Sequence, residues 1–269
     1  MSFAVAMIPY ANTAPYRELG PPSGCCFVAE HPRRSVHSLK HREVWASCVP
    51  VGGLPELAAE VEFVDDLGIA AEGEAQSVLL FSRVPFPDLC CDHHLAVTDQ
   101  TVSSVRLLFL LLGYRQGFDR LPRVTADRER ANAVLLIGDE ALLGLCRREL
   151  GDPGGYPYVT DLATAWWEQW HVPFVFARWV VRRDAPVTVR TAMASWAAEF
   201  HSREAELVAR AARAEATRLG LPESRVAQYF QIVHRIVDAD DCRGQELFLS
   251  EWNRHRREPL FAAPAAGSP

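Results

Sequence analysis

The chain has 269 residues, of which 49% are hydrophobic and 23% are charged, and its 28 basic and 34 acidic side chains give a formal net charge of −6. This length allows one large domain or two of ordinary size, and the composition excludes intrinsic disorder, a collagen-like repeat and a small disulfide-stapled fold. No nucleic-acid partner is predicted, because the negative balance repels polyanions and the densest basic stretch, residues 254–257, is short and flanked by Glu251 and Glu258.

The sequence predicts a cytoplasmic protein that does not enter a membrane. Its N-terminal apolar stretch follows no basic residue and is interrupted by Pro9 and Asn12, unlike a signal peptide. The longest apolar run, residues 107–112, is far too short to cross a bilayer. Seven cysteines, including adjacent pairs at 25–26 and 90–91, fit reduced thiols better than a disulfide framework.

The first part of the chain alternates short apolar runs with loops and helical stretches. Strands are predicted at residues 3–8, 45–49 and 76–82, each followed closely by a proline. Because these strands are apolar on both faces and are separated by helical segments, they indicate a largely parallel α/β sheet.

The middle of the chain continues this alternation. A short strand at 95–97 precedes a helix predicted over 102–113, which the polar residues 98–101 would cap. The next strand, 133–137, leads through Gly138 and Asp139 into another helix. Asp139 therefore sits at the carboxyl end of a strand, which is the edge where open α/β sheets bind ligands.

The last third is mostly helical. A helix containing three tryptophans at 166, 167 and 170, expected to pack in the core, precedes an apolar run at 174–181. Two or three helices follow from about residue 187, with a break at 220–222, and the tail 262–269 is predicted to fray.

The common signatures of catalysis and cofactor binding are absent. There is no GxGxxG, Walker P-loop, GxSxG or HExxH motif, so no cofactor is predicted. Residues 90–94 include metal-ligand types, but adjacent side chains of an extended segment point to opposite faces and no distant Cys or His pair completes a site. No metal is predicted, and spacing alone supplies no base for a cysteine nucleophile.

The informative polar residues lie at strand ends and at one helix start. Unpaired amides and the helix dipole make such a helix start suited to a carboxylate. The alternative is that Thr101 and Ser103 only cap the helix and that Asn12 is only a turn residue. The residues of this set are Asn12, Thr13, Ser77, Thr101, Ser103, Ser104 and Asp139.

The loop Tyr10-Ala11-Asn12-Thr13-Ala14-Pro15 resembles the Y-x-N-x-x-P loop of the chorismate dehydratases, enzymes of the futalosine route to menaquinone. The similarity runs in unbroken order over residues 3–181, with a weaker helical match beyond. Further matching segments are 49–51, 76–82, Asp99–Val105, 136–142, and Asp161-Leu162 with Trp166 followed by P-F-V-F-A-R-W at 173–179.

This resemblance implies a periplasmic-binding-protein fold of the second type, with two α/β lobes and a ligand cleft between them. Residues 1–84 would form the first lobe together with the C-terminal helices of 179–269, and 85–178 would form the second. The chain departs from the family at Trp45, where an acidic residue is usual, and in the segment 23–45, which bears on the shape of the first lobe.

The resemblance also implies the loss of water from chorismate to give 3-[(1-carboxyvinyl)oxy]benzoate, a reaction driven by aromatisation that needs no cofactor or metal. Asn12 would then be the catalytic donor, and Asp139 the titratable candidate, although the base might be a carboxylate of the substrate. Ser103 and Ser104 would hold one substrate carboxylate. The other expected substrate contacts are Ser77, Tyr10, Thr13 and Thr101.

Two other functions remain open from the sequence. One is a non-catalytic small-anion-binding protein of the same fold, and the other is the later pathway enzyme 1,4-dihydroxy-6-naphthoate synthase. The sequence does not predict the oligomeric state or a role for the vicinal cysteines.

Overall fold

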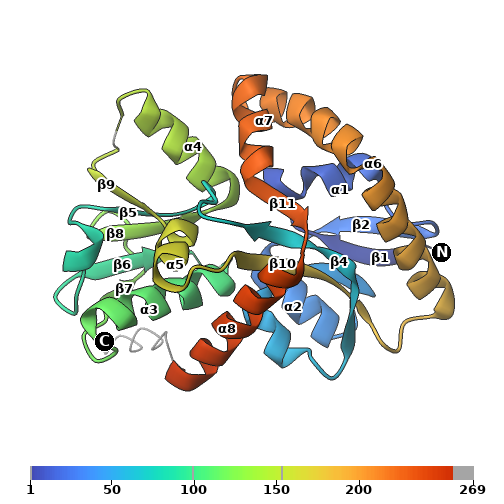
Figure 1. Ribbon diagram of the computed structural model, residues 1–269, viewed down its shortest axis with the longest axis horizontal. Coiled ribbons are helices and arrows are strands. Elements are labelled where there is room, and N and C mark those ends of the chain that lie inside the picture. The colour runs from blue at the N-terminus through green and yellow to red at the C-terminus, as the bar shows by residue number, and fades with distance from the viewer. Residues whose placement is uncertain (1, 99, 153, 257–269) are drawn as a thin grey trace, which may run out of the picture.

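Two separate β-sheets organise the chain in the computed structural model, which describes residues 2–98, 100–152 and 154–256 (Figure 1). Each sheet has its own covering helices and forms the centre of one lobe. Asp99 and the tail 262–269, for which the sequence made predictions, lie outside the described residues. In the described part of the chain, no helix is both long and apolar enough to cross a membrane.

The first lobe is built on a six-stranded sheet with the order β11-β4-β10-β3-β1-β2. Helices α1, α6 and α7 pack on one face of this sheet, while α2 and α8 pack on the other. The strands are β1 (Phe3–Met7), β2 (Cys25–Ala29), β3 (Ala46–Pro50), β4 (Val61–Ala71), β10 (Phe174–Arg182) and β11 (Val233–Ile236). The helices are α1 (Ala14–Leu19), α2 (Pro32–Lys40), α6 (Val187–Leu219), α7 (Glu223–Ile232) and α8 (Ala239–His255), with 3₁₀ turns η1 (Ala11–Thr13) and η2 (Val51–Glu56).

The second lobe has a five-stranded sheet with the order β7-β6-β8-β5-β9. Its strands are β5 (Val78–Ser82), β6 (His94–Val97), β7 (Arg123–Thr125), β8 (Ala133–Ile137) and β9 (Tyr158–Asp161). Its helices are α3 (Ser103–Gln116), α4 (Gly138–Glu149) and α5 (Leu162–Trp170), with a 3₁₀ turn η3 (Phe86–Asp88).

The prediction of largely parallel sheets is wrong. β1 pairs in parallel with β2 and β3, and β6 with β7 and β8. However, β10 and β11 pair antiparallel with their neighbours, and so does β5 with β8 and β9. Helices on both faces bury these strands whatever their direction, so an apolar run does not reveal whether its pairing is parallel.

The strand pairing also moves the expected lobe boundaries. Division at residues 84 and 178 would place β5 in the first lobe and would cut β10 between the lobes, whereas the sheets place β5 in the second lobe and the whole of β10 in the first. The chain therefore crosses between the lobes at about 72–77 and 171–173. Two buried apolar strands look alike in sequence, and only their partners show to which sheet each belongs. β11, with mixed polar and apolar residues, was not predicted as a strand.

One carboxylate fixes the first crossing. Asp161 caps α5 by accepting from the Ala163 amide at 2.9 Å, and it also accepts from the amides of Ala75 at 3.0 Å and Gln76 at 2.7 Å. Burial raises the pKa of Asp161, and the backbone amide donors oppose that rise. Gln76 has a φ of +56°, so the crossing contains a left-handed turn at a non-glycine residue that these bonds help to hold.

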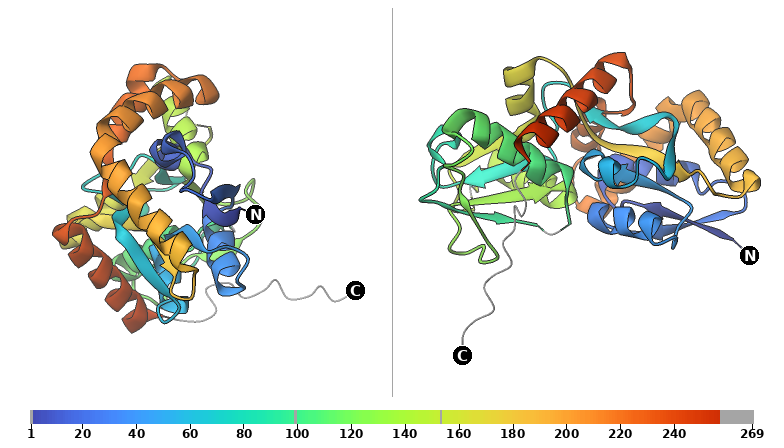
Figure 2. Two further views of the ribbon diagram at one scale, coloured as in Figure 1. Left: turned by 90° about the vertical axis from the view of Figure 1, so that its right-hand side faces the viewer. Right: turned by 90° about the horizontal axis from the view of Figure 1, so that it is seen from below.

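Helix α8 lies across the junction of the lobes (Figures 1 and 2). The Phe248 ring lies 6.1 Å from that of Trp166 in the second lobe and 5.0 Å from that of Phe174 in the first. The helix approaches the second crossing closely at Gly244, where a Cβ atom would collide with the carbonyl oxygen of Pro173. The tryptophan helix thus contributes to the core as predicted, through Trp166.

Gly244→Ala should destabilise the protein, although alanine normally stabilises a helix by about 0.5–1 kcal/mol relative to glycine. Overpacking against Pro173 should cost about 1–3 kcal/mol, so the net effect of the substitution on stability should be unfavourable. The measurement is the thermal midpoint by circular dichroism. Ser250→Ala, at an exposed position of the same helix, is the control and should leave the midpoint unchanged or slightly higher. A higher midpoint for Gly244→Ala would contradict the close approach.

Candidate functional site

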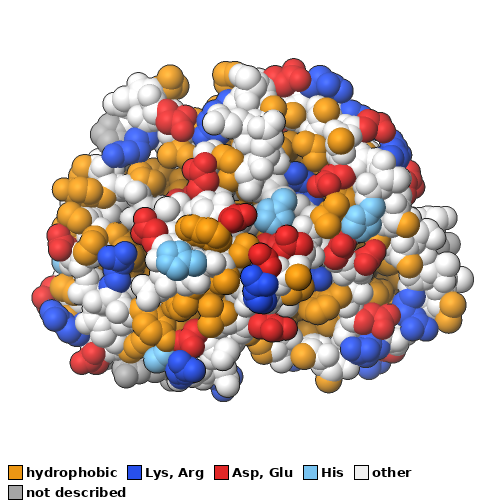
Figure 3. Space-filling model, in the orientation of Figure 1, with side chains coloured by type: hydrophobic (Ala, Val, Ile, Leu, Met, Phe, Trp, Pro, Cys, Tyr) orange, Lys and Arg blue, Asp and Glu red, His pale blue; other side chains and the backbone are white. Residues whose placement is uncertain are grey.

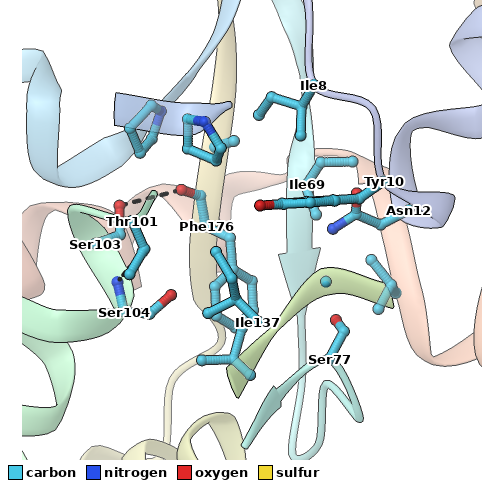
Figure 4. Close-up of a pocket in the computed structure, with 16 residues that line it drawn as sticks. Ile8, Tyr10, Asn12, Ile69, Ser77, Thr101, Ser103, Ser104, Ile137 and Phe176 are labelled. Carbon is cyan, nitrogen blue, oxygen red and sulfur yellow. Dashed lines mark hydrogen bonds between the residues drawn. The ribbon is translucent and has the colours of Figure 1, made fainter. Parts of the chain in front are cut away.

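A cavity lies between the two lobes and is lined by residues of both (Figure 4). It contains about 550 Å³ of space between atoms, its mouth open to solvent included. None of the 16 described residues that line it is Asp, Glu, His, Lys or Arg. Any ionic ligand must therefore be held by hydroxyls, amides and helix ends.

Asn12 reaches the cavity from the loop of residues 8–13, which we call the Asn12 loop. Figure 4 shows its amide directed into the cavity, and its Oδ1 atom is buried without a hydrogen-bond partner in the described structure. Buried polar atoms are nearly always paired, so this amide is prepared to meet a ligand. The predicted neighbour Thr13 does not line the cavity: its buried hydroxyl donates to the carbonyls of Ile8, at 2.5 Å, and Tyr10, at 2.9 Å. Thr13, which the sequence predicted as a substrate contact, instead holds the shape of the loop.

Tyr10 extends across the cavity and touches the second lobe. Its hydroxyl donates to Gln100 Oε1 at 2.9 Å. Its ring packs on Gly138, where a Cβ would lie only 2.7 Å from the ring and where φ is +57°, so both space and backbone favour glycine. Burial, together with the negative charges of Asp139 and Glu140, raises the pKa of Tyr10 to about 12. The phenol is therefore a neutral donor at physiological pH.

The helix predicted from about residue 102 begins at Ser103, and the polar residues at its start have different roles. Thr101 Oγ1 accepts from the Ser104 amide at 3.3 Å, as a helix cap would. Ser103 Oγ accepts from the Gly52 amide at 2.8 Å and donates to the Phe176 carbonyl at 3.3 Å, both in the first lobe. The Ser104 hydroxyl is turned toward the cavity in Figure 4. The capping interpretation thus holds for Thr101, while Ser103 joins the lobes.

Ser77 and Asn12 face the cavity from one side, and Ser103 and Ser104 line it from the other (Figure 4). Ser77 precedes β5, and its hydroxyl donates to the Ala75 carbonyl at 3.2 Å. Between these polar groups the walls are apolar and were not identified from the sequence. They include Ile8, Ile69, Ile137 and Phe176. The cavity therefore suits a ring-shaped ligand with polar groups at its ends.

Asp139 does not line the cavity, contrary to its expected place in the cleft. Its Oδ1 accepts from the Ala11 amide at 2.8 Å, and its Oδ2 accepts from Arg218 at 2.6 Å. The carboxylate thus binds the Asn12 loop from behind. Neither Arg218 nor Gln100 was identified from the sequence, because each lies far along the chain from the loop it helps to hold.

Two other stretches differ from their sequence interpretation. Residues 90–93 form a turn closed by a bond from the His93 amide to the Cys90 carbonyl at 2.9 Å, so the premise of an extended segment was wrong. Candidate ligand atoms of Cys90, Cys91 and Asp92 lie within 4.8 Å of one another, outside the cavity lining. The unusual segment 23–45 folds as β2 and α2, and Pro32 brings it to the cavity wall.

The surface gives no sign of a charged docking face on the side that Figure 3 shows. Acidic and basic side chains are interspersed there rather than gathered by sign.

A protein-family model described as menaquinone biosynthesis matches residues 3–253. A chorismate dehydratase of Thermus thermophilus is 28% identical over 251 residues, covering 89% of this chain and 91% of that protein.

Solved structures confirm the periplasmic-binding-protein-like, two-lobed fold. A protein of Archaeoglobus fulgidus superposes with a TM-score of 0.67 at 18% identity, covering 94% of this chain and 97% of that one. The periplasmic aliphatic sulphonate-binding protein of Escherichia coli gives a TM-score of 0.57 at 13% identity, with 95% and 92% covered. At these identities the likeness concerns the fold alone.

Gly138→Ala should destabilise the protein in a way that depends on Tyr10. The left-handed backbone costs alanine about 1–2 kcal/mol, and the collision with the ring adds to this. In a Tyr10→Ala background only the backbone cost should remain, so urea unfolding of the two single variants and the double variant should show coupling of at least about 0.5 kcal/mol. Strict additivity would contradict the packing of Tyr10 on Gly138.

Proposed function

Because this chain belongs to the menaquinone biosynthesis family, we propose that it removes water from chorismate to give 3-[(1-carboxyvinyl)oxy]benzoate. The Thermus thermophilus relative supports this activity. The observation that carries the proposal is the Asn12 amide, whose buried Oδ1 has no hydrogen-bond partner in the described structure, facing a cavity with no charged residue in its described lining and a helix start on its other side. Such a site can bind a ring acid and assist a leaving group.

The proposed reaction needs no covalent bond between the substrate and the protein. The C–H bond at C3 of the ring and the C–O bond at C4 break, and the electron pair of the C–H bond completes the benzene ring. The proton and the departing hydroxide leave as water, so no electron donor or acceptor is consumed. The protein must orient the ring and stabilise the hydroxyl as it leaves.

The start of α3 is proposed to hold one substrate carboxylate. Helix α3 has 14 residues, and its N-terminal amides and dipole favour an anion in an environment without cationic side chains. Ser104 would add its hydroxyl, while Ser103 keeps the helix start against the first lobe through Gly52. Tyr10 and Ser77 would supply further neutral polar contacts around the ring.

Asn12 is proposed to donate a hydrogen bond to the departing hydroxyl. A preorganised donor placed where charge develops is effective because it needs no reorganisation during the reaction. The nitrogen and oxygen of an amide can exchange places by rotation, so either orientation leaves one polar atom for the ligand.

The proton at C3 is proposed to pass to the carboxylate of the substrate's own enolpyruvyl group. No described lining residue is Asp, Glu or His, and the phenol of Tyr10, with a pKa of about 12, is not a base at neutral pH. Asp139 lies behind the Asn12 loop in contact with Arg218. The substrate is thus the remaining source of a carboxylate inside the cavity.

The purified protein should consume chorismate, as measured by loss of its diene absorbance and by the mass of the product. Asn12→Ala should lower kcat by about 10²–10³-fold, as loss of a transition-state donor does, with a much smaller change in KM. Asn253→Ala, at an exposed position on α8, is the matched control and should behave as wild type.

Three outcomes would replace the proposal. Binding of chorismate without turnover would favour a small-anion-binding protein. Turnover of the cyclised futalosine product in place of chorismate would favour 1,4-dihydroxy-6-naphthoate synthase. Folded protein that neither binds nor converts either compound would remove both enzymatic assignments.

The pH profile tests the source of the base. With a substrate carboxylate as base, kcat should fall only below about pH 5, because carboxyl groups of this kind titrate near pH 4. It should then stay level to about pH 10, since Tyr10, with its pKa of about 12, remains protonated throughout. A step in kcat with a midpoint near pH 7 would instead reveal a titrating base of the protein.

A further inference from the structure

Polar contacts within the first lobe brace the Asn12 loop from one side. Arg17 donates to the Tyr10 carbonyl at 2.8 Å and to Thr13 Oγ1 at 3.0 Å. The same guanidinium pairs with Glu215 of α6 at 2.8 Å, and the other oxygen of Glu215 accepts from Arg218 Nε at 2.7 Å. Glu215 is only 5% exposed, so its charge depends on these two arginines.

Asp139 of the second lobe completes this arrangement into a ring. It accepts from Arg218 at 2.6 Å and from the Ala11 amide at 2.8 Å, so the ring returns to the residue beside Asn12. The four charged groups of the ring, two arginines and two carboxylates, balance one another. Asp139 is the member that comes from the other lobe, so its two contacts join the lobes.

The second lobe forms hydrogen bonds with two consecutive residues of the Asn12 loop, Tyr10 and Ala11. Gln100 accepts from the Tyr10 hydroxyl at 2.9 Å, and Asp139 accepts from the amide of Ala11. Asn12 follows directly, with its amide in the cavity. A movement of the second lobe relative to the first would therefore also move this amide.

Building on the proposed function, we infer that Asp139 and Arg218 are positioning residues: their ion pair latches the closed lobes and sets the Asn12 loop for dehydration. Asp139 serves neither as acid nor as base, because it does not line the cavity and both of its oxygens are engaged. Arg218 contributes although α6 lines no part of the cavity. A small displacement of the loop is enough to matter, because a shift of about 1 Å in a reacting group can cost about 100-fold in rate.

A double-mutant cycle on kcat tests this inference. Asp139→Asn loses the ion pair but keeps an oxygen for the Ala11 amide, and Arg218→Gln loses the same pair from the other side. Each should lower kcat by about 10- to 100-fold, and the double variant should be no slower than the slower single variant, because either single change already removes the Asp139–Arg218 ion pair. Arg218→Lys should recover part of the loss, and Asp139→Ala should be worse than Asp139→Asn.

The matched control is Arg213→Gln, an exposed arginine on the same helix, which should keep wild-type kcat. Thermal midpoints show whether each variant is folded. Loss of turnover by about 1000-fold or more in Asp139→Asn, with Arg218→Gln near wild type, would assign proton transfer to Asp139 and overturn the inference, as would additive effects.

Lobe closure can be measured without turnover. Small-angle X-ray scattering of the unliganded protein should give a larger radius of gyration for Asp139→Asn and Arg218→Gln than for wild type and Arg213→Gln. An unchanged radius in both variants would overturn the latch. Since this readout needs no substrate, failure of the wild-type protein to convert chorismate would count against the proposed function and leave the latch to be judged by scattering alone.

Discussion

The cavity between the lobes has no charged side chain in its described lining, and this constraint shapes the rest of the site. A charged ligand placed there must be stabilised by dipoles, and the starts of α3 and α4 both lie at the wall. An interior without fixed ions also avoids the large cost of burying unpaired charge when the site is empty. The same lack of acidic and histidine side chains supports the proposal that the substrate supplies the base.

The charges that the lining lacks are found directly behind it. Four charged residues neutralise one another in a row: Arg17, Glu215, Arg218 and Asp139. The first and the last of them, Arg17 and Asp139, both bond to the Asn12 loop. Placed in the cavity, the arginines would pair with the carboxylates of a bound acid, and Glu215 and Asp139 would repel them. Placed behind the loop, they act through geometry. The backbone of the Asn12 loop thus lies between the polar side chains of the cavity and the four charged residues.

Many features of the chain were predictable because they depend on local patterns. The strand at 133–137 and the helix start at 103 follow from apolar runs and capping residues, and Asn12 and Ser104 face the cavity as expected. Partners far apart in sequence were not predictable in this way. Thr13 and Asp139 carry suitable chemistry, but the direction of each side chain depends on the turn in which its residue lies. Arg218 comes near the Asn12 loop only because of the position of α6 in the folded protein.

Glycines allow the lobes to approach at the places where the polar contacts form. At Gly52 a Cβ would lie 3.1 Å from the backbone of Ser103 across the gap, and at Gly138 it would lie 2.7 Å from the Tyr10 ring. The Gly52 amide bonds to Ser103, and Asp139 follows Gly138 in the chain and bonds to the Asn12 loop. Each glycine therefore permits the backbone distance that its neighbouring hydrogen bond requires. A side chain at either position would hold the lobes apart, admit water to the cavity, and weaken both the dipoles and the aligned amide on which the proposed elimination depends.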